Sequence, residues 1–376
     1  MGDDSCPEAE SAFGHSRLHG GTNDEGAKAV TDGSPRAGSF HALGFLPVRF
    51  LRASLRNLPP ERAIAWGAAC GRFVARLGGS GARVARINLA LAFPEKSERE
   101  RESLLQGVYA NMGRVVAELA LLQGPHREEL LAGVRMEGLE NLAAAEATSP
   151  NGAIMVMTAH FGSWDLCAAA LSDRGHALTV VHRGFPNPDL EAMFSEIRRG
   201  RDGDLEELKM GPRAVTGVLG ALRRGRKLVV LADQNAKPDE GVFVPFFGVM
   251  AATRSAPALI AMRRGIPVLP AFVFREGESA RHTVRLLPPL DLKLLSGDSD
   301  DALESGVGLM TRAIEDAVRT APDHWLWLHR RWKTRPDGGD ATRPAGFTYP
   351  ERRGLIRRGR RAFRRWRARN PSPLGG

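Results

Sequence analysis

The chain has 376 residues, of which 43% are hydrophobic and 26% are charged. This length can hold one large domain or two ordinary ones, and the composition excludes a chain that is disordered throughout. The formal net charge is +10, but ten arginines and one acid lie within residues 351–370, which leaves +1 for the remainder. The charge therefore indicates a basic tail and argues against a basic nucleic-acid-binding domain.

Residues 1–38 are polar and rich in glycine and serine, so we expect a disordered leader without a signal peptide. The three cysteines, Cys6, Cys70 and Cys167, follow no C-x-x-C spacing. They predict neither a zinc site nor a disulfide framework, and they fit a reducing cytosolic environment. Because no stretch reaches the roughly 18 apolar residues that a spanning helix needs, any membrane contact is expected to be lateral.

Residues 39–130 are predicted to form a helical section that docks on the membrane. Its first helical pattern has apolar or small residues three and four positions apart, at Ile64, Gly67, Ala68, Gly71, Phe73, Val74 and Leu77. A later helix is predicted to begin at a Ser97 cap. Its apolar stripe, which should pack on the core, comprises Leu104, Leu105, Val108, Tyr109, Met112, Val115, Val116 and Leu119.

Short β-rich runs alternate with helical segments over residues 131–336. The runs read VRME, AIMVMT, ALTVVHR, KLVVLAD, PVLPAFVFRE and HTVRLLPPL. Helices are predicted over residues 164–173, 188–199, 212–224, 255–264 and 302–319. This alternation predicts an α/β catalytic core with a largely parallel central sheet flanked by helices, followed by the basic tail over residues 337–376.

His160 follows an apolar run, Ala153 to Thr158, that has the form of a strand buried on both faces. Ligands of α/β sheets bind at the carboxyl ends of strands, and a histidine is suited to take a proton from a hydroxyl. Asp165 follows across a tight turn and could orient the ring. A histidine bonded to backbone, beside an aspartate that favours a helix N-terminus, explains the same spacing. The H-x-x-x-x-D pattern alone therefore does not decide between the two.

Several motifs, in order along the chain, carry a resemblance to a known family. They are LRNLPP (55–60), NLALAFPE (88–95), TAHFGSWDL (158–166), DQNAKPDEGVFVPFFGVMAAT (233–253) and WLWLHRRWKTRP (325–336). Together they resemble the bacterial lipid A biosynthesis acyltransferases, the late lauroyl and myristoyl transferases of the lysophospholipid and glycerol-phosphate acyltransferase superfamily. The resemblance covers roughly residues 40–336, and separated motifs in a fixed order are far more specific than any one of them.

This resemblance implies a glycerol-phosphate-acyltransferase-like fold and catalysis without metal, cofactor or covalent intermediate. A hydroxyl of a lipid A precursor or similar glycolipid, activated by His160, would attack an acyl thioester carried by acyl carrier protein or coenzyme A. The resemblance also implies a peripheral or monotopic place on the cytoplasmic face of the bacterial inner membrane. Nucleic acid is not expected as a partner, because the basic and aromatic segment 325–336 matches the family's terminal motif.

Four further residues are expected at the site by their family positions. Arg183 closes a strand and is expected to bind a phosphate of the acceptor or to stabilise the oxyanion, with an ordinary surface arginine as the alternative. Asp233 and Gln234 follow another strand and are expected to orient His160 or the incoming hydroxyl, with a turn cap as the alternative. Arg330 is expected to meet phosphates of lipid headgroups, with a solvated basic face as the alternative.

Two other segments are each open to more than one interpretation. The aromatic run GVFVPFFG, residues 241–248, either lines a groove for an acyl chain or packs in the core. The basic tail either lies on an anionic leaflet, attracts acidic acyl carrier protein, or has no function. Cys167 lies in an apolar helical run, where a thiol is usually buried and inert, so we reject it as a nucleophile.

Asp165 stands where lipid A enzymes usually have glutamate, so the sequence leaves the acceptor open. A lysophospholipid, glycolipid or aminolipid acyltransferase that uses acyl-CoA is therefore an alternative. A hydrolase that cleaves acyl esters in the same cleft is another. From a different class, a catalytically inactive module that only binds membrane lipids would have the same fold.

Overall fold

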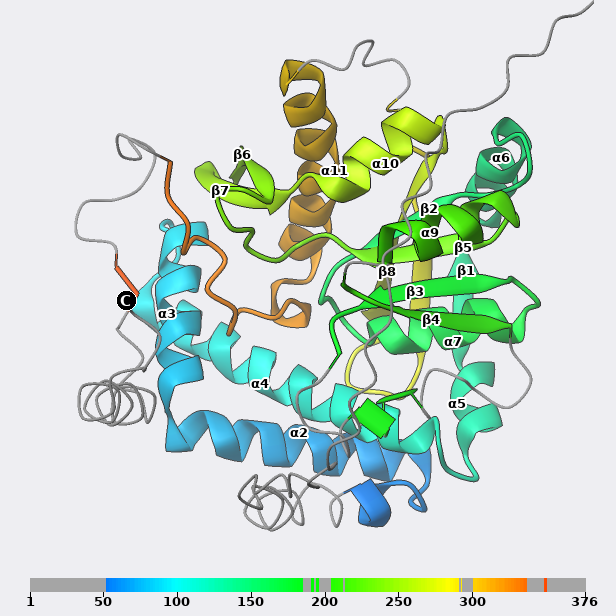
Figure 1. The fold of residues 1–376 in the computed structure, drawn as a ribbon. Coiled ribbons are helices and arrows are strands. Elements are labelled where there is room, and N and C mark those ends of the chain that lie inside the picture. Colours follow the sequence, from blue (N-terminus) through cyan, green and yellow to red (C-terminus); the bar gives the residue numbers. More distant parts are fainter. Residues whose placement is uncertain are drawn as a thin grey trace, which may run out of the picture. The chain divides into compact units, whose positions relative to one another are not determined.

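The computed structural model describes residues 52–184, 191–192, 194–195, 204–211, 214–290, 292, 300–336 and 348–349, all within one compact unit of residues 45–376. Figure 1 shows the order of the elements along the chain. The predicted leader, nearly all of the basic tail and most of the helix predicted over residues 188–199 lie outside the described residues.

Helices make up the N-terminal section, as predicted: α2 (Pro60–Leu77), α3 (Ser80–Ala92), α4 (Glu98–Leu121) and α5 (Arg127–Ala132). The predicted cap of α4 is confirmed. The Ser97 hydroxyl accepts a hydrogen bond from Glu100 N at 3.3 Å, and the Glu100 carboxylate accepts one from Ser97 N at 2.7 Å. Helices α2 and α4 lie side by side (Figure 1). They touch backbone to backbone at Gly67 and Gly113, where a methyl group on either glycine would collide with the other's carbonyl oxygen.

Within the residues that the structure describes, seven strands form a mostly parallel sheet, which confirms the predicted fold class. In spatial order they are β1 (Val134–Glu137), β9 (His282–Leu286), β8 (Val268–Arg275), β2 (Met155–Thr158), β5 (Lys227–Leu231), β3 (Leu178–His182) and β4 (Leu205–Lys209). Every neighbouring pair is parallel except β8 and β9.

The sequence did not predict strand β4 or the antiparallel hairpin of β6 (Gly241–Phe246) and β7 (Val249–Arg254). Strand β4 reads LEELK and is only partly buried, so it lacks the continuous apolar run by which the inner strands were found. The hairpin pairs within itself and lies outside the seven-stranded sheet.

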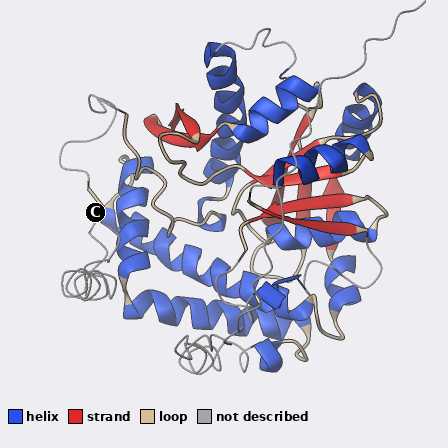
Figure 2. Ribbon diagram, in the orientation of Figure 1, coloured by secondary structure: helices blue, strands red, loops and turns tan. Residues whose placement is uncertain are grey.

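Helices cover both faces of the sheet (Figure 2), because the central strand β2 is apolar on both sides. Met155 and Met157 pack with α9 (Ala214–Arg223), α10 (Ala256–Arg264) and α11 (Asp300–Thr320). Ile154 and Val156 pack in a second cluster with α6 (Leu139–Thr148) and α7 (Trp164–Asp173). Helices α7, α9, α10 and α11 begin and end within two residues of their predicted bounds.

The apolar pattern of α2 does not form one buried face. Its buried side carries mainly small residues, at Ala63, Ile64, Gly67, Ala68, Gly71 and Ala75. Phe73, Val74 and Leu77, which belong to the same sequence pattern, are exposed instead. The close approach to α4 needs the glycine side of α2, so the large side chains remain outside. No helix in the described part of the chain is both long enough and apolar enough to cross a membrane.

Candidate active site

The loops that follow β2 and β5 meet at one edge of the sheet. These strands are parallel neighbours, with Thr158 of β2 level with Leu231 of β5. His160 stands two residues beyond Thr158, and Asp233 stands two residues beyond Leu231. The pairing of the two strands therefore brings a histidine and a carboxylate to the same height at their carboxyl ends.

Asp233 holds His160 by two contacts. Its Oδ1 lies 2.8 Å from Nδ1 of the ring, and its Oδ2 accepts a hydrogen bond from the backbone N of His160 at 3.1 Å. The carboxylate is buried, and Oδ2 also accepts a hydrogen bond from Trp325 Nε1 at 2.8 Å. With its proton on Nδ1 facing the carboxylate, the neutral ring presents the lone pair of Nε2. This is the arrangement of a general base oriented by a carboxylate.

The electrostatics of the pair favour a basic imidazole. Burial disfavours the charged form of His160, but the charge and hydrogen bond of Asp233, with the charge of Asp165, raise its pKa above 6.5. Burial likewise acts to raise the pKa of the Asp233 carboxyl, but contacts with His160 and Trp325 outweigh it and lower that pKa to about 2. The His160 side chain retains 20% of its exposure, so the ring is accessible.

Asp165, the partner predicted from spacing, lies buried in the first turn of α7, where its charge acts on His160. The turn between the two residues depends on Gly162, which has φ of 55° and whose Cβ would collide with the carbonyl oxygen of Val273. Trp164 packs edge-on against the His160 ring, with the ring centroids 5.1 Å apart. The structure thus brings both aspartates to His160, and the one that contacts Nδ1 is Asp233.

Gln234 and Arg183 stand at the same edge. Gln234 Nε2 lies 3.2 Å from Nε2 of His160, the nitrogen that faces away from Asp233. Arg183 directly follows β3, the other neighbour of β5, and its side chain is exposed. Burial lowers the pKa of His329 to about 4, and the positive charges of Arg331, His160 and Arg183 act in the same direction, against the charge of Asp233. The ends of β2, β5 and β3 thus carry an imidazole, the carboxylate that contacts it, an amide and a guanidinium.

The segment 325–332 lies against the site and closes it from one side. Trp325 forms an isolated antiparallel β-bridge with Phe161. Leu326 N donates a hydrogen bond to the carbonyl oxygen of His160 at 3.0 Å. The three tryptophans of this segment, Trp325, Trp327 and Trp332, are fully buried. Arg330, predicted to meet headgroup phosphates, is half-buried and lies over the ring of Tyr349, 5.8 Å from its centroid.

Asn88, from the NLALAFPE motif, holds this segment in place. Its side chain is buried and donates hydrogen bonds to the carbonyl oxygens of Trp327 and His329, each at 2.7 Å. The Tyr349 hydroxyl donates in turn to Asn88 Oδ1 at 2.6 Å. Sequence reasoning missed the positioning roles of Asn88 and Trp325, for which membership of the family motifs was the only signal.

The aromatic run of the β6–β7 hairpin packs in the core. Phe246 and Phe247 are buried, and the Phe246 ring contacts those of Trp325 and Trp332 with centroids 5.4 and 5.6 Å apart. Phe247 contacts Phe93 at 5.3 Å. These contacts favour core packing over an acyl-chain groove for these two rings.

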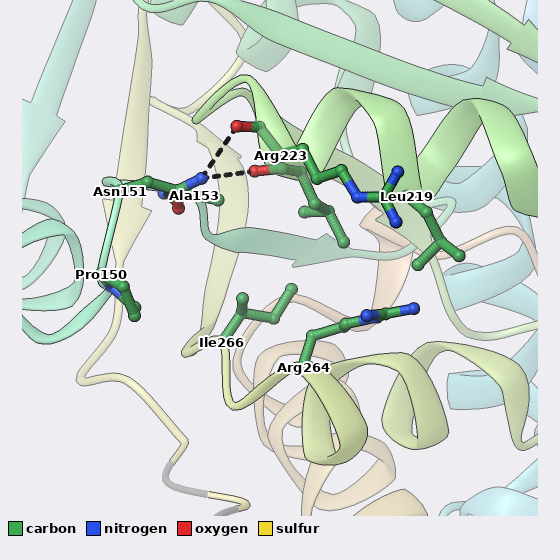
Figure 3. Close-up of a pocket in the computed structure, with 8 residues that line it drawn as sticks. Pro150, Asn151, Ala153, Leu219, Arg223, Arg264 and Ile266 are labelled. Carbon is green, nitrogen blue, oxygen red and sulfur yellow. Dashed lines mark hydrogen bonds between the residues drawn. The ribbon is translucent and has the colours of Figure 1, made fainter. Parts of the chain in front are cut away.

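A cavity of about 270 Å³ opens between α9 and α10, at the other end of the strands (Figure 3). It is lined by Pro150, Asn151, Ala153, Leu219, Leu222, Arg223, Arg264 and Ile266. Ala153 and Ile266 precede β2 and β8, whereas His160 follows β2. At about 3.3 Å per residue, the seven positions from Ala153 to His160 span roughly 20 Å. The cavity is therefore separate from the His160 site.

The described residues support neither a metal site nor a cysteine nucleophile. In the part of the chain that the structure describes, no three histidine, cysteine, aspartate or glutamate side chains gather so as to hold a metal ion. The Cys167 thiol is buried in α7, and burial raises its pKa to about 12, so it is not a nucleophile at neutral pH.

Comparison with known proteins identifies relatives across most of the chain. Residues 40–334 match the family model for bacterial lipid A biosynthesis acyltransferase. The chain is 29% identical over 286 residues to lipid A biosynthesis acyltransferase 1 of Shigella flexneri, which covers 76% of this chain and 85% of that protein. It is 28% identical, with the same coverage, to the lipid A biosynthesis myristoyltransferase of Escherichia coli (strain K12). The lauroyltransferase of that strain is 26% identical over 72% of this chain and 85% of its own length.

Proposed function

Because the chain belongs to the bacterial lipid A biosynthesis acyltransferase family, we propose that it transfers a fatty-acyl group from a thioester to a hydroxyl of a lipid A precursor or similar glycolipid. The observation that carries the proposal is His160, with Nδ1 held 2.8 Å from the buried carboxylate of Asp233. The family supports the reaction class, and the pair supports general-base activation of the hydroxyl.

In the proposed reaction, Nε2 of His160 takes the proton of the acceptor hydroxyl while its oxygen attacks the thioester carbonyl carbon. The carbonyl π electrons move to oxygen and form a tetrahedral oxyanion. When this intermediate collapses, the carbon–sulfur bond breaks and the departing thiolate takes the proton from the imidazolium. The products are an ester and a free thiol, and His160 is neutral again, so the step needs neither metal nor cofactor.

The two aspartates take different parts in this proposal. Asp233 fixes the tautomer and orientation of His160 and stabilises the imidazolium, because its carboxylate contacts Nδ1 directly. Asp165, predicted from spacing as the orienting partner, instead acts on His160 through its charge. The contact of Asp233 with the ring supports this division.

Three other residues are proposed to bind substrate. Gln234 has its amide nitrogen 3.2 Å from His160 Nε2, which is the position that the acceptor hydroxyl would take. Arg183 is proposed to bind a phosphate of the acceptor or the oxyanion, because a guanidinium offers bidentate donors to either. Arg330 is proposed to meet a phosphate of the lipid headgroup.

We further propose acyl carrier protein as the carrier of the donor thioester, with coenzyme A as the alternative. The acidic surface that acyl carrier protein presents would be attracted by the positive charge of the chain. The lipid acceptor and the family together support a place on the cytoplasmic face of the bacterial inner membrane, peripheral or monotopic. The basic tail, where it meets an anionic leaflet, would strengthen that association.

The test is an acyl-transfer assay with purified protein, a lipid A precursor and lauroyl or myristoyl acyl carrier protein, read by mass spectrometry. We expect a lipid product heavier by one acyl chain. Parallel reactions with acyl-CoA and with lysophospholipid separate the alternative donors and acceptors. Free fatty acid without lipid product would identify a hydrolase. Binding without any turnover would identify an inactive lipid-binding module and contradict the proposal.

A further inference from the structure

The outward face of α2 combines large apolar side chains with unpaired positive charge. Trp66, Phe73 and Leu77 are 63%, 58% and 69% exposed. Their spacing of seven and four residues sets them on one side of the helix, opposite the side that packs on α4. Large apolar side chains gathered on one exposed helix face indicate a binding surface, whereas single exposed ones do not.

Two basic residues of α2 lie beside this apolar row. The segment from Arg52 to Phe93 holds seven arginines and one acid, Glu61, although Arg72 pairs with Glu278 and Arg86 with Glu102. The Glu61 carboxylate is already occupied, because it accepts hydrogen bonds from Ala280 N at 3.1 and 3.2 Å. Within the described residues, Arg62 and Arg76 of α2 lie in no ion pair, and helical spacing places Arg62 one turn before Trp66.

We propose that this face of α2, with Trp66, Phe73 and Leu77 inserted and Arg62 and Arg76 at the headgroups, docks the protein on an anionic lipid bilayer. The inference deepens the proposed function and rests on it in taking a membrane lipid as the acceptor. A row of tryptophan, phenylalanine and leucine flanked by arginines is the composition of helices that lie in the bilayer interface. Tryptophan favours the headgroup level, and arginines there are attracted by anionic lipids.

Charge favours a lipid surface over a second copy of this chain. A symmetric contact between two copies would set the same arginine-rich face against itself, and like charges in a contact oppose association. An anionic leaflet instead offers negative charge to the arginines and hydrocarbon to the apolar row. The rigid backbone contact of Gly67 and Gly71 with α4 fixes the face in this orientation.

Docking through α2 also places the active site relative to the membrane. Helix α4, against which α2 packs, contacts the 3-10 turn η2 (Pro322–His324) through Asn111, whose Nδ2 lies 3.5 Å from His324 O. His324 O accepts a hydrogen bond from Gly162 N, two residues past His160, at 2.9 Å. A single helix, about 10 Å across, thus separates the docking helix from the segment beside His160.

The test measures sedimentation of the full chain with vesicles of phosphatidylcholine, with and without phosphatidylglycerol. We expect binding to the anionic vesicles, and at least about tenfold weaker binding for the Trp66→Glu/Phe73→Glu variant, since each change sets a charge in the apolar row. The matched control is Val215→Glu/Leu309→Glu, which changes two exposed apolar residues on α9 and α11. The control should bind like the wild type, and equal binding by all three proteins overturns the proposal.

A second measurement does not depend on a disruptive variant. Brominated phosphatidylcholine in the vesicles should quench the fluorescence of the wild type more than that of Trp66→Phe, while both proteins bind equally. Equal quenching overturns the insertion of Trp66. Gel filtration tests the alternative partner. If the wild type elutes as a dimer, Trp66→Glu/Phe73→Glu elutes as a monomer and vesicle binding is unchanged, the face binds a second copy and the proposal is overturned.

Activity separates this proposal from the proposed function. The Trp66→Glu/Phe73→Glu variant should transfer acyl groups normally to an acceptor dispersed in detergent and more slowly to one embedded in vesicles. Vesicle binding through α2 by a protein without transferase activity would overturn only the proposed function. Transfer activity in a protein whose vesicle binding ignores Trp66 and Phe73 would overturn only the docking surface.

Discussion

Two carboxylate–histidine contacts in this protein have the same length and different surroundings. His160 Nδ1 lies 2.8 Å from Asp233 at the ends of β2 and β5, and His282 Nε2 lies 2.8 Å from Glu118 between β9 and α4. The His160 side chain is 20% exposed, whereas that of His282 is 1% exposed. Glu118 also pairs with Arg275, whose Nη1 lies 2.5 Å from its carboxylate. Asp233 instead accepts a hydrogen bond from the neutral indole of Trp325.

Access of the ring to solvent and neutralisation of the carboxylate distinguish the pair that we propose to be reactive from the structural one. Arg275 already balances the charge of Glu118, and the surrounding core seals the ring of His282 from any substrate. Burial raises the pKa of Glu118, but Arg275 and His282 outweigh it and hold that pKa far below its usual range. Among the described residues no arginine forms an ion pair with Asp233, whose charge raises the pKa of His160. The Glu118 cluster joins α4 to β8 and β9, while the His160 ring of the Asp233 pair remains partly exposed.

Replacing the two histidines should separate these roles most strongly. His160→Ala should lower kcat of acyl transfer by about 10²- to 10⁴-fold, the contribution of a positioned general base. The matched His282→Gln variant should retain kcat per folded molecule. Initial rates with acyl carrier protein thioester, normalised to folded protein, measure both. Equal losses of kcat in His160→Ala and His282→Gln would contradict the assignment of different roles to the two histidines.

Replacing the buried carboxylate of Glu118 by an uncharged amide should instead lower the free energy of unfolding. Glu118→Gln leaves Arg275 buried without its counter-charge, and removing one partner of a buried pair destabilises by about 3–5 kcal/mol. Urea unfolding measures this loss. Glu102→Gln is the control, because its pair with Arg86 is exposed on both sides and contributes about 0–1 kcal/mol. A stable Glu118→Gln protein with lost activity would place this cluster in the reaction.

Trp325→Phe should give the smallest effect on the reactive pair. The change removes the indole hydrogen bond to Asp233 Oδ2, and a hydrogen bond to a charged group contributes about 1.5–3 kcal/mol. We expect kcat/KM to fall by roughly tenfold. Trp327→Phe is the matched control, because its indole donates to Pro322 O instead of the carboxylate. If both variants behave alike, Trp325 acts through packing and not through Asp233.

The sequence contained the elements of this site but not their pairing. His160 and Asp233 each follow an apolar run, so both could be placed at strand ends. Which carboxylate contacts the ring depends on β2 and β5 being neighbours, a pairing across 73 residues that local spacing cannot reveal. Spacing therefore favoured the nearer Asp165 as the partner, although the turn at Gly162 carries it into α7. Asp233 was expected to orient His160 or the hydroxyl only from its family position.

Contacts over long sequence separation also explain what else was missed. Asn88 donates a hydrogen bond to the carbonyl oxygen of Trp327, which lies 239 residues later in the sequence. Glu118 lies in α4, for which the sequence predicted only the apolar stripe that packs on the core. On α2 the periodicity correctly predicted a helix. It could not show that the glycine side faces α4, which leaves Phe73 and Leu77 of the same pattern exposed.

The most direct test of the central claim is the pH dependence of kcat/KM for wild type, Asp233→Asn and Asp165→Asn. A general base acts only when neutral, so activity should rise through the pKa of His160, and in wild type the midpoint should lie above 6.5. Asp233→Asn removes the larger opposing charge and should move the midpoint to lower pH, with a smaller movement for Asp165→Asn. A midpoint that is unchanged in Asp233→Asn, or that moves further in Asp165→Asn, would contradict the account.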